Sequence, residues 1–455
     1  MPDRHAVIWS RDAQGPHKMG DLVLTDQECR FSYTAEFLAR DNKNGLALLA
    51  SPELFGTNPV VYRSSARMPF HPRLMALTPG EAPGNIQRRI YNDILAKRNP
   101  PPAPGLDTEW ELLLLAGHGG IGHIDVFRDD RAAEQWYARD IHRDSLIGQR
   151  SSVWRFIRED IEQTAPETDT ASIARLLGPT PSVGGMIPKL LVAIPDRPDW
   201  SGRFAPPGTQ EHKGEPFTDV VLKIEPAIYS GVLALEALCY EVHRELGFDV
   251  PRIWRNELDG MPLLAVERFD RDSDAVPVPM ESFLSVLASG SREVMGSTDI
   301  DMVGVAAMLT KLATVVNLDP RRAQEQVFRR FCAALLTGNG DMHLENLAFL
   351  GGPRQVRIAP VYDPAPMRAW PRHNLRSAIP IDFDAAKSVG ENLLELGISF
   401  GLRRAEVLEL FAQFLEGTQQ YPERVMALDE VPLERRQQLV DIVRTERATL
   451  ASVLG

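Results

Sequence analysis

The feature that most constrains the fold is a polar loop enclosed between a predicted helix and a predicted β-hairpin. The helix ends at Gly338, and its apolar face has helical spacing: Val327, Phe331, Ala334 and Leu335. The polar run GNGDMHLEN (338–346) follows it. Two apolar runs, 347–350 and 356–361, then flank Gly351-Gly352-Pro353, which predicts a hairpin. This loop is the most informative stretch of the chain for function.

Upstream of the loop, short apolar runs predict a small sheet and one helix. The runs 189–194 (KLLVAI) and 220–224 (VVLKI) predict two strands that pair as a hairpin across a long polar connection. We expect Ser230 to cap a helix that ends at Gly247. The apolar face of that helix would contain Leu235, Leu238, Cys239, Val242 and Leu246. The run 263–266 (LLAV) predicts a further strand.

The first part of the chain predicts a separate small unit. It contains possible strands near 20–24 and 29–33, an extended proline-rich linker at 99–105, and a helix over 109–115. The fold class that follows is α+β, with two kinase-like lobes, an N-terminal α+β subdomain and a mainly helical C-terminal lobe. The predicted parts are an N-terminal subdomain (1–145), a small lobe (146–275) and a helical lobe (276–455).

Composition limits the classes of function. The chain has 50 lysines and arginines against 62 aspartates and glutamates, a net charge of −12, so we do not expect direct nucleic-acid binding to be its main function. The pairs Arg321-Arg322 and Arg329-Arg330 are interpreted as solvated helix faces. Three widely spaced cysteines (Cys29, Cys239 and Cys332) form no zinc or redox motif and favour a reducing compartment. Without a signal peptide or a long apolar run, we expect a cytoplasmic protein with no membrane contact.

Three polar residues have the order and spacing of a phosphotransferase site. Asp341 and Asn346 are five positions apart, as in the catalytic loop of protein kinases, where the Asp orients the attacking hydroxyl and the Asn binds a metal ion. Asp363 follows the hairpin, where kinases carry a second metal-binding Asp. Oxygen ligands of this kind suit Mg²⁺. Each residue alone is also typical of an ordinary loop or turn; their order favours the kinase interpretation.

The predicted sheet supplies a complementary cation. Lys223 lies in a strand whose neighbouring residues, Leu222 and Ile224, should point to the opposite face. Glu236 follows in the next helix, and a Lys–Glu pair of this type holds the lysine on nucleotide phosphates. Taken singly, Lys223 is also compatible with a solvent-exposed position, and Glu236 alone favours one. The pair Gly184-Gly185 either forms an ordinary turn or lets backbone N–H groups approach a phosphate.

Together these motifs resemble the HipA family of bacterial serine/threonine kinases, the toxins of toxin–antitoxin pairs. The resemblance covers nearly the whole chain. Its catalytic part contains SVGGMIPK (182–189), VLKIEP (221–226), Glu236, VERFDR (266–271), GDMHLEN (340–346) and YDP (362–364). Its N-terminal part contains FSYTAEFL (31–38), LTPGEAPGNIQRR (77–89) and LAGHGGIGHIDV (115–126).

The resemblance implies a role for each matching residue. Asp341 would be the catalytic base, Asn346 and Asp363 the Mg²⁺ ligands, and Lys223 the phosphate-binding lysine, with Glu236 as its partner. Further contacts to ATP would come from the phosphate loop, the hinge and the catalytic segments: Gly184, Gly185, Met186, Ile187, Pro188, Lys189, Glu267, Arg268, Phe269, His343 and Tyr362. The sequence departs from many relatives at Glu345, where they carry a basic residue.

The resemblance also implies regulation and partners. Ser182 would be autophosphorylated, and a phosphate inside a phosphate-binding loop would repel ATP. The implied partners are a protein substrate, such as an aminoacyl-tRNA synthetase or another translation component, and a helix-turn-helix antitoxin of the HipB type that carries the DNA contact. Two alternatives remain open: a small-molecule phosphotransferase, and a non-catalytic co-repressor scaffold. Ser182 speaks against the first. The intact polar residues of the predicted site speak against the second: Asp341, Asn346, Asp363 and Lys223.

Overall fold

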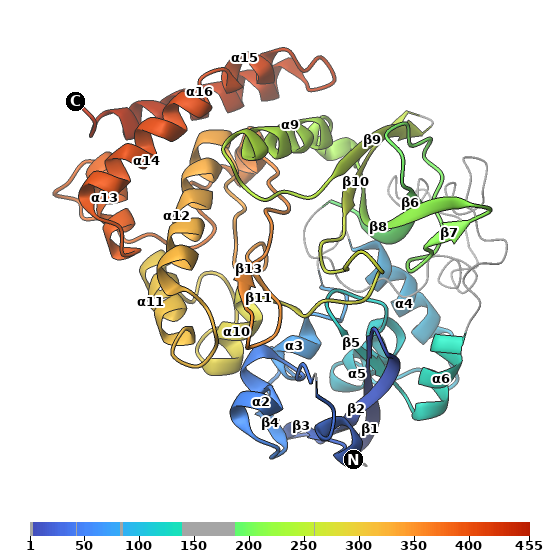
Figure 1. The fold of residues 1–455 in the computed structure, drawn as a ribbon. Coiled ribbons are helices and arrows are strands. Elements are labelled where there is room, and N and C mark those ends of the chain that lie inside the picture. The colour runs from blue at the N-terminus through green and yellow to red at the C-terminus, as the bar shows by residue number, and fades with distance from the viewer. Residues whose placement is uncertain (1–2, 42, 82–84, 139–186, 259) are drawn as a thin grey trace. The chain divides into compact units, whose positions relative to one another are not determined.

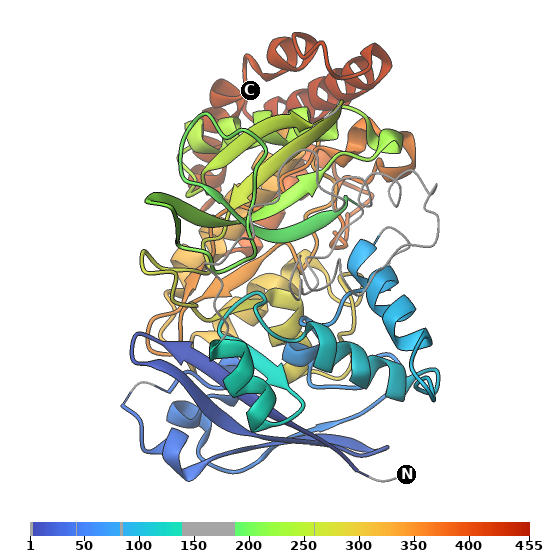
Figure 2. The same cartoon turned by 90° about the vertical axis from the view of Figure 1, so that its right-hand side faces the viewer.

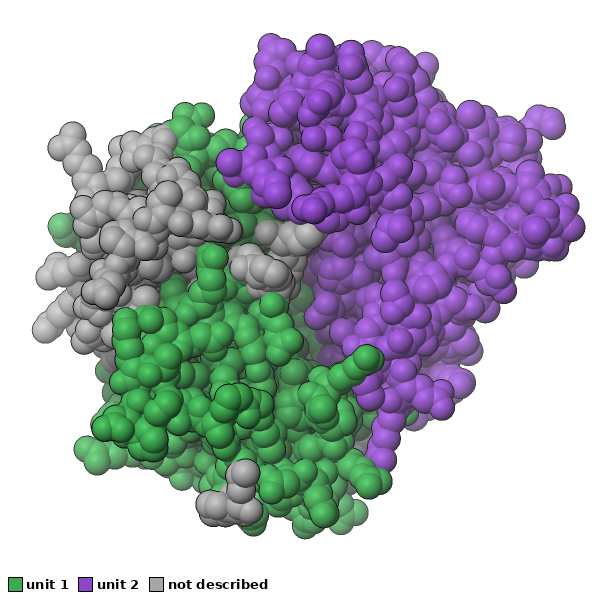
Figure 3. All heavy atoms as spheres, turned by 180° about the vertical axis from the view of Figure 1, so that it is seen from behind, with its two compact units in different colours: residues 1–226, 252–281, 288–290 green, residues 227–251, 282–287, 291–455 purple. Residues whose placement is uncertain are grey.

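The computed structural model describes residues 3–41, 43–81, 85–138, 187–258 and 260–455, which form two compact units (Figure 3). Unit 1 contains the chain up to residue 226, with 252–281 and 288–290. Unit 2 contains 227–251, 282–287 and 291–455. Within the described ranges, no helix is both long enough and apolar enough to cross a lipid bilayer.

Unit 1 begins with an antiparallel five-stranded sheet in the order β4-β3-β2-β1-β5. Its first strands, in dark blue, lie side by side in Figure 2. Its strands are β1 (Arg4–Asp12), β2 (Gly15–Leu24), β3 (Glu28–Tyr33), β4 (Val60–Arg63) and β5 (Ile124–Phe127). The helices of this part are α1 (Ala35–Leu38), η1 (Leu48–Ala50), α2 (Pro52–Phe55), α3 (Pro72–Met75), α4 (Ile86–Ala96), α5 (Leu106–Ala116) and α6 (Asp130–Ala138). Alternate residues of the strands, such as Ile8, Leu22 and Phe31, pack with Trp110 of α5 in one core.

A second antiparallel sheet in unit 1 has the order β6-β8-β10-β9. Its strands are β6 (Lys189–Pro195), β8 (Glu215–Ile224), β9 (Ile253–Leu258) and β10 (Met261–Glu267), and the short β7 (Glu211–His212) pairs with β8. One face of the sheet is apolar and contains Leu190, Leu222, Ile224 and Leu263. Side chains alternate along a strand, so Lys189 and Lys223 lie on the other face, where the register places them directly opposite each other.

Unit 2 is mainly helical (Figure 1). Its helices are η2 (Ala227–Tyr229), α9 (Val232–Glu245), α11 (Met302–Leu312), α12 (Pro320–Thr337), η3 (Met367–Ala369), η4 (Pro371–His373), α13 (Val389–Ser399), α14 (Arg404–Gly417), α15 (Tyr421–Met426) and α16 (Leu433–Ala451). A hairpin joins β12 (Ala348–Leu350) to β13 (Arg357–Ile358), and β11 (Met280–Ser282) leads into α10 (Phe283–Gly290) where the two units meet in sequence.

Helix α12 is the buried centre of unit 2 and contacts α11, α14 and α16. The Asp319 side chain accepts the Arg322 N–H at its start, and Pro320 occupies the first turn. Gly338 ends it with φ of 76°, a left-handed conformation that glycine adopts without strain. A Cβ at Gly338 would also lie 2.3 Å from Leu439, so the helix end and the start of the polar loop are fixed together.

The sequence-based fold class is confirmed. The expected strands, the hairpin and the helix ending at Gly338 are all present. One cap is wrong: α9 begins after Gly231 rather than Ser230, because the chain turns there with φ of 85° and a Cβ would lie 2.7 Å from the Val431 Cα. The sequence also left β1 and β5 unpredicted. The boundaries at 145 and 275 stay predictions.

Candidate active site

The loop after α12 is held by its own hydrogen bonds. The Asp341 N–H donates to the Asn339 side-chain oxygen at 2.9 Å, and the Asp341 carbonyl accepts the His343 N–H at 2.8 Å. The Asn346 side-chain amide also donates to this carbonyl, at 2.9 Å. The backbone of Asp341 is therefore fixed on both sides of its Cα, which restricts where its carboxylate can lie.

Asn346 has one side-chain atom left for a cation. Because its Nδ2 donates to the Asp341 carbonyl, its Oδ1 is the acceptor that remains. In the described part of the chain, no three His, Cys, Asp or Glu side chains gather into a metal site of their own. An amide oxygen and a carboxylate fit Mg²⁺, which usually takes one or two protein oxygens and completes its shell with phosphates and water.

Asp363 adopts a strained backbone conformation. Its φ is 53°, in the left-handed region that non-glycine residues rarely occupy. The Asp363 N–H donates to the hydroxyl of Tyr240 on α9 at 3.1 Å. Strain of this kind costs about 1–3 kcal/mol and persists where neighbouring contacts fix the residue, often at functional sites.

Tyr240 also contacts the second acidic residue of the predicted site. Glu236 is one helical turn earlier on α9, is fully buried, and accepts a hydrogen bond from Tyr240. Burial raises the pKa of Tyr240 well above its usual value, and the negative charges of Glu236 and Asp363 raise it further. The interpretation of Glu236 as an exposed residue is therefore wrong.

Unit 1 carries the two lysines of the predicted nucleotide site. Lys223 is 3% exposed, so it is not the solvent-facing strand residue that the sequence left possible, and Lys189 is also buried, at 4%. They lie opposite each other on the sheet face away from Leu222 and Ile224, which is the face predicted for Lys223. The strand is anchored just before Lys189, where the Pro188 carbonyl accepts the Ile224 N–H at 3.0 Å. Ile187 is buried beside it. The pairing of Lys223 with Glu236 stays a prediction, because the two belong to different units.

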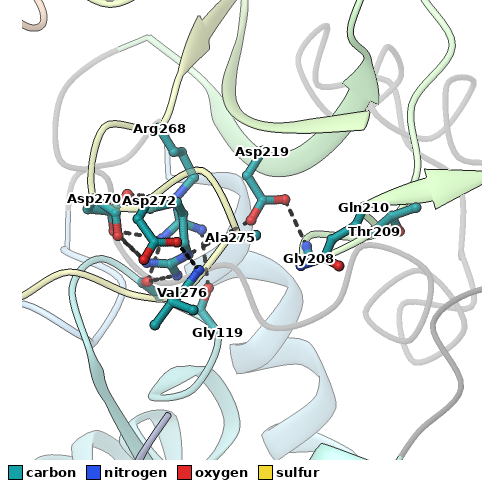
Figure 4. Close-up of polar contacts among 12 residues, drawn as sticks. Gly119, Gly208, Thr209, Gln210, Asp219, Arg268, Asp270, Asp272, Ala275 and Val276 are labelled. Carbon is teal, nitrogen blue, oxygen red and sulfur yellow. Dashed lines mark hydrogen bonds and ion pairs between the residues drawn. The ribbon is translucent and has the colours of Figure 1, made fainter. Parts of the chain in front are cut away.

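The hinge residues have structural partners of their own. Arg268 is buried and forms an ion pair with Asp270 at 2.8 Å (Figure 4). It also donates to the Gly120 carbonyl at 2.6 Å. Glu267 forms an ion pair with Arg252 at 2.7 Å. The Arg268 side chain thus connects the hinge to the loop before β5. The side chains of Glu267 and Arg268 thus already have partners. A contact from residues 267–269 to adenine would come from their backbone or from the Phe269 side chain.

The remaining predicted residues of unit 2 brace the loop. The His343 Nδ1 accepts the Glu345 N–H at 3.2 Å, and the hydroxyl of Tyr362 donates to the Glu345 carbonyl at 2.6 Å. Glu345 itself points to solvent, with 58% of its side chain exposed. Ser182, Gly184, Gly185 and Met186 lie outside the described residues.

Sequence reasoning missed three residues near this loop. Tyr240 lies within the predicted helix that ends at Gly247, and no motif in the sequence distinguishes it from the apolar residues around it. Arg330 was interpreted as solvated, but only 7% of it is exposed. The side of α12 that carries Arg330 faces the end of the hairpin, and the guanidinium donates to the Ala359 carbonyl there. His373 gave no motif signal; partial burial lowers its pKa, and the negative charge of Asp341 opposes that shift.

Comparison with known proteins identifies the family. The family model described as the HipA-like C-terminal domain matches residues 181–421, more than half of the chain. The chain belongs to the HipA-like family. Its fold matches HipA in a Shewanella oneidensis complex of HipA, HipB and operator DNA, with a TM-score of 0.65, 17% identity and coverage of 99% of each chain. This confirms the family resemblance and the fold expected from the sequence.

Two curated relatives match part of the sequence. A Haemophilus influenzae protein, named as a candidate kinase, is 22% identical over 211 residues, which are 42% of this chain and 62% of that protein. A Sinorhizobium fredii protein with a similar name is 29% identical over 157 residues, 31% of this chain and 36% of that protein. The chain thus spans less than two thirds of the length of either relative.

Proposed function

We propose that this protein is a serine/threonine protein kinase that transfers the γ-phosphate of ATP to a protein hydroxyl and to its own Ser182. The observation that carries the proposal is the arrangement within unit 2: Asp341 and Asn346 are locked into one loop, and Asp363 is held in a strained conformation by Tyr240. The family assignment and the names of the two curated relatives support it.

Each residue contributes to binding or positioning. Asp341 would accept a hydrogen bond from the substrate hydroxyl and orient its oxygen toward the phosphorus atom. The Asn346 Oδ1 and the Asp363 carboxylate would hold Mg²⁺, which screens phosphate charge when it is bound. Lys223 would bind phosphate oxygens. Positioning and electrostatics account for most of the catalysis of phosphoryl transfer, which agrees with a site built from rigid hydrogen bonds.

We further propose that the protein acts as the toxin of a toxin–antitoxin pair. The solved HipA structure is bound to HipB and to operator DNA, so a HipB-type antitoxin is the partner we expect, with DNA contacted through it. The net charge of −12 agrees with an indirect contact to DNA. The proposed class of substrate is a translation component, such as an aminoacyl-tRNA synthetase. The proposed location is the cytoplasm.

Labelled phosphate tests the proposal. The full chain is incubated with γ-labelled ATP and Mg²⁺, alone and with a cell extract, and the label is mapped by mass spectrometry. We expect label on Ser182 and on serine or threonine of other proteins. Ser182→Ala should remove the first and keep the second. Label that appears only on metabolites would replace this proposal with a small-molecule phosphotransferase, and no label and no ATP binding would favour the scaffold.

A further inference from the structure

Arg330 is a buried cation without a direct counter-charge in the described part of the chain. Only 7% of the residue is exposed. Its Nη2 donates to the Ala359 carbonyl, whereas its Nε and Nη1 are buried and meet no hydrogen-bond acceptor among the described residues. Burial lowers the pKa of Arg330 to about 10, and Tyr362 and Asp249 oppose the shift. The guanidinium therefore keeps its charge at neutral pH.

A small cavity adjoins this arginine beneath the catalytic loop. Its volume is about 20 Å³, and its polar lining consists of Arg330, Asn339, Asn346, Tyr362 and His243. No aspartate or glutamate is among the described residues that line it. Arg330 and the two asparagines that fix the Asp341 backbone thus line one cavity.

The chemistry of the lining favours a small anion. A buried charge is stable only when it is paired, and an unsatisfied buried N–H carries a desolvation penalty of its own. A space of this size holds about one water molecule or one monatomic ion, so a small ion fits it better than a phosphate, sulfate or carboxylate group. His243 adds no competing positive charge, because burial, with the nearby Arg330, holds its pKa at about 4.

We propose that this cavity binds a monovalent halide ion, chloride in physiological solution, between Arg330 and the catalytic loop. The ion accepts an N–H of the guanidinium where it borders the cavity and supplies the missing counter-charge. A second consequence rests on the proposed kinase function: because Asn339 and Asn346 share the cavity, the ion stabilises the loop that positions Asp341. Kinase activity should then be higher in chloride than in gluconate at equal ionic strength.

Bromide tests the site without any measurement of activity. Crystals of the full chain are soaked in bromide, and the anomalous signal of bromine is measured. We expect one peak in this cavity, beside the guanidinium of Arg330, in the wild-type protein, and no peak there in Arg330→Met. A cavity that holds only water in bromide-soaked wild-type crystals would overturn the proposal. An inactive protein that still binds bromide would contradict the kinase assignment and leave the halide site intact.

Thermal unfolding in solution gives an independent readout. A ligand that binds only the folded state raises Tm with its concentration. In chloride or bromide, compared with gluconate at the same ionic strength, wild-type Tm should rise by about 2 °C. Arg330→Met should lose this difference. The matched control is Arg322→Met, an exposed arginine on the same helix, which should keep it. A halide-dependent shift of equal size in Arg330→Met would refute the site. If that variant does not fold, the bromide peak in the wild-type crystal decides.

Discussion

The hydroxyl of Tyr240 accepts the backbone N–H of Asp363 at 3.1 Å, and this bond ties helix α9 to a backbone position with φ of 53°. The same hydroxyl donates to the buried Glu236. A single phenol group therefore contacts both acidic residues that flank it, one on the helix and one on the segment after the hairpin. We interpret Tyr240 as a positioning residue, which holds Asp363 in the conformation required for its proposed role as metal ligand.

Replacement of Tyr240 by Phe should weaken Mg²⁺ binding at the proposed site while it preserves the packing of the core. The ring remains, but the Asp363 N–H and the Glu236 carboxylate lose their partner. We expect a loss of about 1–3 kcal/mol in the free energy of unfolding and a roughly 10–100-fold drop in kcat/KM, partly restored by high Mg²⁺. Kinase assays across a Mg²⁺ titration measure this effect.

The control for this variant is Tyr33→Phe. The Tyr33 hydroxyl likewise accepts one backbone N–H, from Leu46 at 2.7 Å, and donates to one acceptor, the Ala50 carbonyl at 2.7 Å. It lies in the N-terminal sheet of unit 1. We expect a similar loss of stability with an unchanged Mg²⁺ dependence. Equal Mg²⁺ profiles for the two variants would show that Tyr240 is only a structural residue.

Removal of the Asn346 side chain should affect metal binding and loop geometry together. Asn346→Ala loses the proposed Mg²⁺ ligand and the donor to the Asp341 carbonyl. Activity should fall by roughly 10²–10³-fold, the range typical for loss of one preorganised polar contact at a reacting centre. Asn317→Ala is the control, because Asn317 donates to the Arg354 carbonyl in an exposed turn and should leave activity intact. A fully active Asn346→Ala would remove Asn346 from the site.

The two buried lysines of unit 1 should differ in their effect on ATP. We expect Lys223→Met to lower kcat/KM for ATP by about 10²–10³-fold, because the proposed phosphate contact is lost. Lys189→Met, on the strand opposite, should have a smaller effect, and the exposed Lys311→Met none. Kinase assays with increasing ATP give kcat/KM for each of the three variants. A larger loss for Lys189→Met than for Lys223→Met would exchange the roles that the sequence assigned.

Acid should destabilise the fold through buried neutral histidines. Burial lowers the pKa of His243 to about 4, below the usual value of 6.5. The unfolded chain therefore binds more protons, so the stability from this residue is present above pH 6.5 and is lost as the pH falls toward 4. Between pH 7 and pH 5 the loss is about 2 kcal/mol for one such histidine. Urea unfolding at both pH values measures it, and His243→Gln should reduce the loss by that amount. An unchanged loss would assign it to other groups.

Local patterns predicted the scaffold well because burial imposes them on the sequence. Short apolar runs marked β6 and β8, helical spacing marked α9 and α12, and Gly338 marked the helix end. The spacing of Asp341, Asn346 and Asp363 marked the candidate site because all three lie close to one hairpin along the chain. Strand β1, which has many polar residues and an irregular register at Ile8, gave no comparable signal.

Tertiary contacts explain what the sequence did not predict. Tyr240 and Asp363 are 123 residues apart, so no local spacing indicates their hydrogen bond. Arg330 has the sequence context of a solvated arginine pair, and only the packing of α12 buries it. Arg268 matched a hinge motif, but its side chain lies against Asp270 and the Gly120 carbonyl. In each case, long-range packing rather than local pattern determines the environment of the side chain.

The most direct test of the central claim separates ATP binding from phosphate transfer in Asp341→Gln. Calorimetry with ATP and Mg²⁺ measures binding, and single-turnover labelling measures transfer to protein. If Asp341 orients the substrate hydroxyl, the variant should bind ATP with near wild-type affinity and transfer phosphate at least about 10²-fold more slowly. Asp441→Gln, an exposed position on α16, should behave as wild type. Transfer by Asp341→Gln at the wild-type rate would contradict the account.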